Sequence, residues 1–225
     1  MFKFDVHKNP EAMVTFIEEE FLSMLANYNE TIWPVQILAY IIAVTAVVAC
    51  FIKTRYSDRV IMASLVLFWL WNGIVFSAIF WSEIYPYAYL FAALLTSQGL
   101  LFAYGMIRSE FSFRFRLNGY SVTGLLFIVY ALLVYQLIGM GIGHDYPRFF
   151  APGLTPCPTA IFTFGILLLT DKRFPNYFLA IPSMFALGGI MAALNGIIED
   201  YGLITAGILG TVLLYRRNKL PKAVR

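Results

Sequence analysis

The sequence predicts an all-α membrane protein, a bundle of seven transmembrane helices with an N-terminal amphipathic interfacial helix. Three observations lead to this fold class. Of 225 residues, 60% are hydrophobic and only 13% charged, whereas an average soluble domain has about 25% charged residues. Apolar runs of about 20 residues recur, each long enough to cross a ~30 Å hydrocarbon core. Basic and acidic residues also separate along the chain in step with these runs.

An amphipathic helix is predicted before the first apolar run. Pro10 suits its first turn, and Glu18 and Glu19 fall on the face opposite its apolar stripe. That stripe consists of Val14, Ile17, Phe21, Met24, Leu25 and Tyr28. The helix can lie in the outer membrane interface or pack on the external loops, and the pattern fits both placements. Residues 1–32 are therefore expected to form an external segment.

Seven apolar runs follow, and each predicts one helix. Their approximate bounds are 33–52, 60–82, 86–107, 118–142, 157–170, 177–197 and 201–215. Residues 33–215 thus form the expected transmembrane domain, and residues 216–225 a basic cytoplasmic tail.

The distribution of charge predicts the orientation in the membrane. Thirteen of the 16 Lys and Arg residues fall on one side of the runs, and ten of the 13 Asp and Glu residues on the other. The positive-inside rule places the C-terminus in the cytoplasm and the N-terminus outside, which agrees with an odd number of spans. The start of the chain lacks a basic region followed by an apolar one, so no cleavable signal peptide is expected.

No Asp, Glu, Lys, Arg or His lies inside the seven predicted spans. Ionisable groups inside the membrane mark proton relays and ion pathways, so this pattern argues against a conventional proton-coupled mechanism. It also excludes a retinal protein with a Schiff-base lysine, a cytochrome b with paired histidines and an intramembrane aspartyl protease. We expect no cofactor and no nucleic-acid partner. The partners that we do expect are the lipid bilayer, a small-molecule solute, and either a second copy of the chain or a partner in a larger membrane complex.

The fifth run is short, and the loop before it is rich in proline. Residues 158–170 would form only about 20 Å of helix, with the basic residues after it at the cytoplasmic surface. The preceding stretch, "LTPCP", should therefore descend into an external vestibule, because irregular backbone inside a membrane must be buried in protein or hydrated. Short, proline-interrupted segments also point to substrate sites in transporters.

Polar residues converge on this external side. The candidate binding residues are His144, Asp145, Tyr146, Cys157, Thr159, Glu83 and Glu199, with Asp200 beside the last. His144 can simply pin the loop, or the cluster can recognise a solute entering from outside. Alternatively, His144, Cys157 and Met140 can bind a soft metal such as Cu(I), or Cys157 and His144 can form a nucleophilic pair. No catalytic residue is assigned.

Uncharged polar residues inside the spans have two interpretations. They can hold the helices together by interhelical hydrogen bonds, or some can line a binding pocket. The candidates for that pocket are Gln36, Asn72, Gln98 and Asn195.

Three stretches also carry a family resemblance: "YNETIWPVQ" at 28–36, "YPYAYLFAALLTSQGLLF" at 85–102 and "GHDYPRFFAPGLTPCPTAIFTFGILLL" at 143–169. They resemble a bacterial family of multi-pass membrane proteins, a domain of unknown function without an assigned activity. The resemblance extends over about 28–215 and implies a location in the bacterial cytoplasmic membrane. Because the family has no assigned activity, the expected function is inferred from the residues alone. It is a small-solute permease or transport-associated binding protein with an outward-facing site. The alternative is a non-transporting receptor or an accessory subunit of a larger complex.

Overall fold

The computed structural model describes residues 10–194 and 196–219, with side chains from residue 19 onward. In this part of the chain the regular structure is helical apart from two isolated β-bridges, Phe113–Thr170 and Pro152–Thr155. The all-α prediction is confirmed.

The helices follow one another closely along the chain. Three predicted spans contain a change of helix type, since π-helical or 3₁₀ segments interrupt or extend them. In order, the elements are α1 (Pro10–Thr31), α2 (Val35–Phe51), α3 (Ser57–Trp71), η2 (Asn72–Phe80), η3 (Trp81–Glu83), α4 (Ala88–Ile107), α5 (Gly119–Val129), η4 (Tyr130–Val134), α6 (Tyr135–Gly141), α7 (Pro156–Leu168), α8 (Tyr177–Leu194), η5 (Ile198–Asp200) and α9 (Tyr201–Lys219).

Five helical segments of the described chain are long and apolar enough to cross a membrane. They match the predicted second, third, fourth, sixth and seventh spans: Ser57–Glu83, Ala88–Ile107, Gly119–Gly141, Tyr177–Leu194 and Ile198–Lys219. The first predicted span, α2, has 17 residues and meets α1 at a bend of 86°, and the pair would make a sixth crossing if counted together. The fifth, α7, has only 13 residues. Both are too short to meet the length of about 20 residues by themselves.

The observed segments extend past the predicted spans and so include acidic residues near their ends, among them Glu199 and Asp200. Both belong to the segment Ile198–Lys219, and both side chains have 0% relative exposure. The sequence pattern ended one helix before these residues and began the next after them, because carboxylates interrupt an apolar run. The 3₁₀ turn η5 instead carries them into the bundle at the start of α9.

Helix α7 lies at the centre of the bundle. It packs against α5, α8 and α9 and also contacts α3, and all of its residues except Cys157 are buried. A helix that is apolar around its whole circumference is expected to be buried in this way. Gly124 of α5 and Gly165 of α7 face each other, because a Cβ at either one would lie 2.7 Å from the carbonyl oxygen of the other. Glycine thus allows these two backbones to approach closely.

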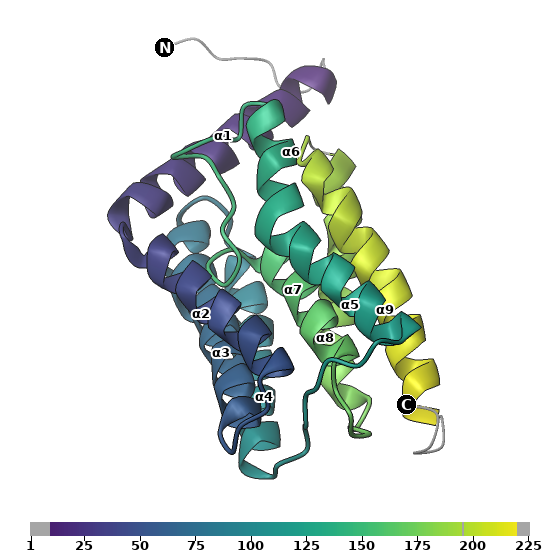
Figure 1. The fold of residues 1–225 in the computed structure, drawn as a ribbon. Coiled ribbons are helices and arrows are strands. Elements are labelled where there is room, and N and C mark those ends of the chain that lie inside the picture. The colour runs from purple at the N-terminus through teal and green to yellow at the C-terminus, as the bar shows by residue number, and fades with distance from the viewer. Residues whose placement is uncertain (1–9, 195, 220–225) are drawn as a thin grey trace.

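Helix α1 lies across one end of the bundle, over the loop that leads to α7 (Figure 1). Its Leu25 and Tyr28 are fully buried, whereas Glu19 and Glu20 are exposed. The side chains of Val14, Ile17 and Glu18 lie outside the described residues. The Tyr28 hydroxyl donates a hydrogen bond to the Leu154 carbonyl oxygen at 2.7 Å. Of the two predicted placements, the structure therefore has α1 packed on the loop.

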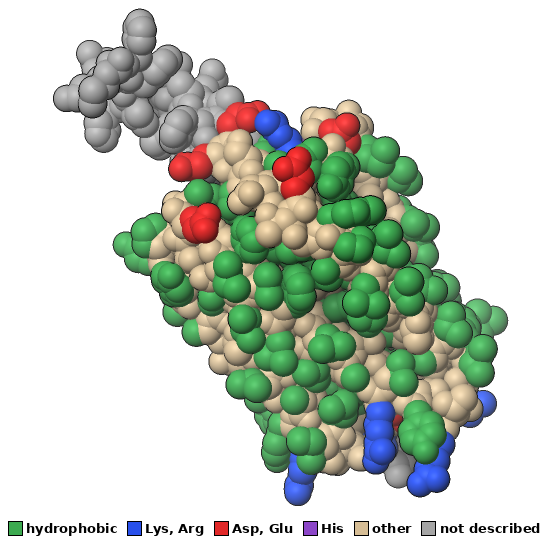
Figure 2. Space-filling model, turned by 90° about the vertical axis from the view of Figure 1, so that its left-hand side faces the viewer, with side chains coloured by type: hydrophobic (Ala, Val, Ile, Leu, Met, Phe, Trp, Pro, Cys, Tyr) green, Lys and Arg blue, Asp and Glu red, His purple; other side chains and the backbone are tan. Residues whose placement is uncertain are grey.

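Charged side chains gather at the two ends of the molecule. In Figure 2 most acidic side chains lie at the end covered by α1, most Lys and Arg side chains lie at the opposite end, and hydrophobic side chains cover the surface between them. Apolar side chains such as Leu100, Leu137 and Leu187 are more than half exposed. Such a surface fits an environment of lipid, and a membrane location is plausible.

Candidate functional site

The candidate site begins with a π-helical turn in the segment Gly119–Gly141. In η4 the Tyr135 amide donates to the Tyr130 carbonyl oxygen, so residues five apart stack on one another. The two aromatic rings lie 6.2 Å apart and nearly perpendicular. Regular α-helical geometry would turn them to different faces. The π-turn therefore directs both hydroxyl groups toward the start of α9.

Two neighbouring residues of η5, Glu199 and Asp200, accept hydrogen bonds from these hydroxyl groups, one through a backbone carbonyl oxygen and the other through its carboxyl group. The Tyr135 hydroxyl donates to Asp200 Oδ1 at 2.6 Å, and the Tyr130 hydroxyl donates to the Glu199 carbonyl oxygen at 2.9 Å. Gly196, with φ of 99°, occupies the left-handed region between α8 and η5, where glycine avoids the strain that a Cβ would cause. This turn brings Glu199 and Asp200 back into the bundle.

His144 forms the second contact to this pair. Its Nδ1 lies 2.7 Å from Glu199 Oε1, and the two side chains are 4% and 0% exposed. The backbone of Gly139 makes room for the contact, because a Cβ there would lie 2.8 Å from Glu199 Oε1. The Gly139 carbonyl oxygen also accepts a hydrogen bond from the His144 amide at 2.8 Å. The end of α6 thus positions the imidazole against the carboxylate.

Cys157 joins the cluster from the first turn of α7. Its thiol is in side-chain contact with the carboxyl group of Asp200 and the hydroxyl group of Tyr135. The contacts of Cys157 therefore run to Asp200, whereas the imidazole of His144 contacts Glu199. We call His144, Glu199, Tyr135, Asp200 and Cys157 the polar cluster.

In each carboxyl group of the polar cluster, one oxygen is hydrogen-bonded to a neighbouring side chain and the other oxygen has no such bond to any described residue. Glu199 Oε2 and Asp200 Oδ2 are buried, and neither has a hydrogen-bond partner among the described residues. A buried carboxylate oxygen without a partner is costly, so these two atoms are the places where a proton or another ligand would bind most favourably. In the described part of the chain, no three His, Cys, Asp or Glu side chains are arranged to hold a metal ion.

The other predicted site residues lie elsewhere. Thr159 Oγ1 accepts from the Gly153 amide at 2.7 Å, and the Asn72 amide group donates to Thr159 Oγ1 at 3.3 Å and to the Gly153 carbonyl oxygen at 3.1 Å. These bonds satisfy the irregular backbone before α7. The loop residues 151–156 are all buried and are covered by α1 rather than lining an open vestibule.

Gln36 and Gln98 take part in separate contacts. The Gln36 amide group donates to the Asn29 carbonyl oxygen at 2.8 Å, and that of Gln98 to the Phe178 carbonyl oxygen at 3.1 Å. Each side chain thus bonds a different part of the backbone. Asn195, the fourth residue predicted for an intramembrane pocket, lies outside the described residues.

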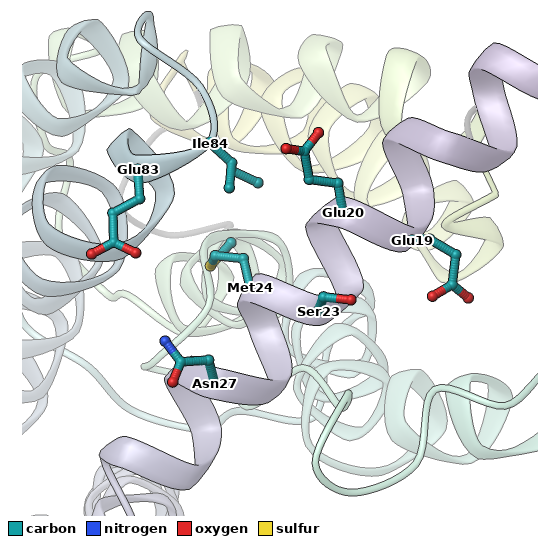
Figure 3. A pocket seen from close by; sticks show the side chains of 7 residues that line it. All are labelled: Glu19, Glu20, Ser23, Met24, Asn27, Glu83 and Ile84. Atoms are coloured by element: carbon teal, nitrogen blue, oxygen red, sulfur yellow. The ribbon is translucent and has the colours of Figure 1, made fainter. Parts of the chain in front are cut away.

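Three acidic-end residues lie on the surface rather than in the polar cluster. Asp145 and Glu83 are exposed, and Tyr146 is 54% exposed with its ring against Trp33. Glu83 lines a groove of about 420 Å³ beside α1. In Figure 3, Glu83 and Glu20 flank Met24 from two different elements. This groove lies between α1 and the end of η3.

Sequence reasoning did not single out Tyr135, and it did not include Asp200 among the binding residues. Asp200 could have been found from its position next to Glu199. Tyr135 had no such signal, because the π-turn that aligns it with Tyr130 breaks the spacing of an α-helix.

Comparison with known proteins gives one match. Residues 18–225 match a family of unknown function, DUF6064. The chain belongs to this family. The resemblance inferred from the sequence, to an uncharacterised family, is thereby confirmed. No similar curated protein and no similar solved structure was found.

Proposed function

We propose that this chain is a small-solute permease, or a transport-associated binding protein, whose site is the polar cluster. The single observation that carries the proposal is the pair of fully buried carboxyl groups of Glu199 and Asp200, each with one oxygen without a partner in the described chain. Ionisable residues within a membrane bundle are costly, and they commonly mark ion and substrate pathways.

The chemistry of the polar cluster favours a small cation or a proton as the solute. Glu199 and Asp200 are adjacent, and their repulsion when both are ionised would be relieved by a positive charge between them. His144 and Tyr135 already hold one oxygen of each carboxyl group, which leaves the remaining two oxygens in defined positions. A ligand with several polar hydrogens, such as ammonium or guanidinium, could bridge both.

The proposal includes a seven-segment arrangement in a bacterial cytoplasmic membrane. Helices α2 and α7 would complete the seven, with α7 enclosed by its neighbours and so independent of the full bilayer thickness. The separation of charge supports an external N-terminus and a cytoplasmic C-terminus. With α1 on the outside, the site would face outward but be closed by α1 and the loop 142–155.

Reconstitution of the full chain in liposomes tests this function. Charge displacement on solid-supported membranes would be recorded after steps of pH, sodium, potassium, ammonium, guanidinium and choline. We expect a response to at least one of these probes. The Glu199→Gln/Asp200→Asn variant should reduce it by about tenfold or more, because charge-assisted contacts to the cation are lost.

A matched control separates the buried carboxyl groups from the acidic surface. Glu83→Gln and Asp145→Asn remove exposed acids at the same end and should leave the response unchanged. A response that survives in the Glu199→Gln/Asp200→Asn variant would contradict the proposed site. If no probe gives a response, and native mass spectrometry shows a retained partner chain, the alternative of a receptor or accessory subunit is favoured instead.

A further inference from the structure

A second groove opens at the opposite, basic end of the bundle. It has a volume of about 250 Å³ and forms where three segments distant in sequence meet. These segments are the chain around the start of α3, the end of α4 with the residues after it, and the connection between α7 and α8. The polar cluster does not include any of them, so the function proposed above leaves this groove unexplained.

Three cationic side chains line the rim of this groove: Arg55, Arg59 and Lys172. All three residues are exposed. Among the described residues, no carboxylate forms an ion pair with any of them. The Lys172 ammonium group donates to the Ser109 carbonyl oxygen at 2.9 Å, which anchors this cation at the groove.

The one acidic residue that lines the groove is already neutralised. Asp58 Oδ1 forms an ion pair with the ammonium group of Lys53 and accepts a hydrogen bond from the Phe113 amide at 2.8 Å. Lys53 itself also donates to Ser112 Oγ and to the Phe113 carbonyl oxygen. Asp58 is therefore committed to the fold, and the charge of Arg55, Arg59 and Lys172 remains for a ligand.

The inner part of the groove is apolar. Met62 and Phe111 are buried there, and Met106 is partly buried beside them. Gly105 allows this close packing, because a Cβ would lie 2.8 Å from the Phe111 ring. The groove thus combines a cationic rim with an apolar floor, which suits a ligand with an anionic group and a short uncharged remainder.

We propose that this groove binds a phosphate-bearing anion. Guanidinium groups match phosphate oxygens in geometry and donate two parallel hydrogen bonds, and an ammonium group adds a third charged contact. Basic pockets between helices at the cytoplasmic face of a membrane protein commonly hold the phosphate of an anionic lipid. The same chemistry suits a soluble phosphate compound, so the ligand class is defined by a phosphate group and a net negative charge.

Thermal unfolding of the purified full chain in a neutral detergent tests the proposal, with the fluorescence of the four Trp residues as readout. Inorganic phosphate and short-chain phosphatidylglycerol are titrated separately, with phosphatidylcholine of the same chain length as the zwitterionic comparison without net charge. We expect saturable stabilisation by phosphate or by phosphatidylglycerol, and little by phosphatidylcholine. A response to phosphate identifies a soluble source, and a response to phosphatidylglycerol alone identifies a lipid head group. Either response supports the site.

Substitution of the rim locates the binding. Arg55→Gln/Arg59→Gln should weaken the apparent affinity by about tenfold or more, because two charge-assisted contacts are lost. Arg114→Gln/Arg216→Gln removes two exposed arginines from the same end and outside this groove, and should bind as the native chain does. Equal affinity in both double variants would overturn the proposal, as would a native chain that responds to neither ligand. The measurement is independent of solute transport.

Discussion

The ion pair of the polar cluster and two ion pairs at the basic end differ in how far they are buried. At the basic end, the ion pairs Lys53–Asp58 and Arg116–Asp171 have side chains that are 23% to 52% exposed. At the acidic end, His144 and Glu199 form their contact with 4% and 0% exposure. Water screens the first two pairs, whereas the third depends on the protein for its solvation. The polar cluster is therefore more sensitive than the basic-end pairs to the loss of a single partner.

Removal of the imidazole should have the largest effect on stability. His144→Ala leaves Glu199 buried without its partner and should lower the free energy of unfolding by about 3–5 kcal/mol. Equilibrium unfolding in mixed micelles measures this change. His144→Ala/Glu199→Leu removes the buried charge as well and should recover part of the loss. A cost below about 1 kcal/mol for His144→Ala would mean that the pair behaves like a surface ion pair.

The two tyrosines of the π-turn give a matched pair of smaller effects. Tyr135→Phe removes a hydrogen bond to the carboxyl group of Asp200 and should cost about 1.5–3 kcal/mol, the range for bonds to charged groups. Tyr130→Phe removes a bond to a neutral carbonyl oxygen and should cost about 0.5–1.5 kcal/mol. The same unfolding measurement compares them. Equal costs would indicate that the carboxyl group of Asp200 makes no special contribution.

Loss of the hydrogen bonds between α1 and the loop 142–155 should have a smaller effect on stability. The Asn29 amide group donates to the carbonyl oxygens of Pro147 and Phe149 at 2.7 and 2.8 Å. Asn29→Ala should therefore cost about 1–2 kcal/mol and increase hydrogen exchange in residues 142–155. Asn27→Ala, at an exposed position on the same helix, is the control. Unchanged exchange in the Asn29→Ala variant would show that α1 does not hold the loop.

Loss of an ion pair at the basic end should have the smallest effect on the free energy of unfolding. Arg116→Gln removes an ion pair whose Arg side chain is 52% exposed, and should change the free energy of unfolding by less than about 1 kcal/mol. Added salt should reduce even this difference. Unfolding of both proteins at low and high salt measures it, and a cost comparable with that of His144→Ala would remove the contrast between the two ends.

Much of the fold could be predicted because apolar length is a local property. The five long spans and the amphipathic character of residues 19–31 follow from composition and spacing in short windows. The short helix α7 was also foreseen, with its proline-rich loop descending before it. Whether α7 would be central or peripheral was not predictable, because its uniform apolar surface fits both a lipid environment and a protein core.

The candidate site was predicted only in part. His144, Cys157 and Glu199 were named from their shared side of the membrane, and the structure brings them into one cluster with Asp200 and Tyr135. Asp145, Tyr146 and Glu83 share that side but remain on the surface. The order of the helices indicates which end of the bundle a residue occupies, whereas the burial of its side chain depends on which helix packs against it.

The sequence by itself determined the helical class, the long apolar segments and the separation of acidic from basic ends. These features depend on neighbouring residues and on the energetics of transfer from water, which act locally. Only the tertiary structure decided that Glu199 and Asp200 are buried, that a π-turn directs two tyrosines toward them, and that α1 closes the loop. Those outcomes depend on contacts between residues 60 or more positions apart, and no local pattern records which of them form.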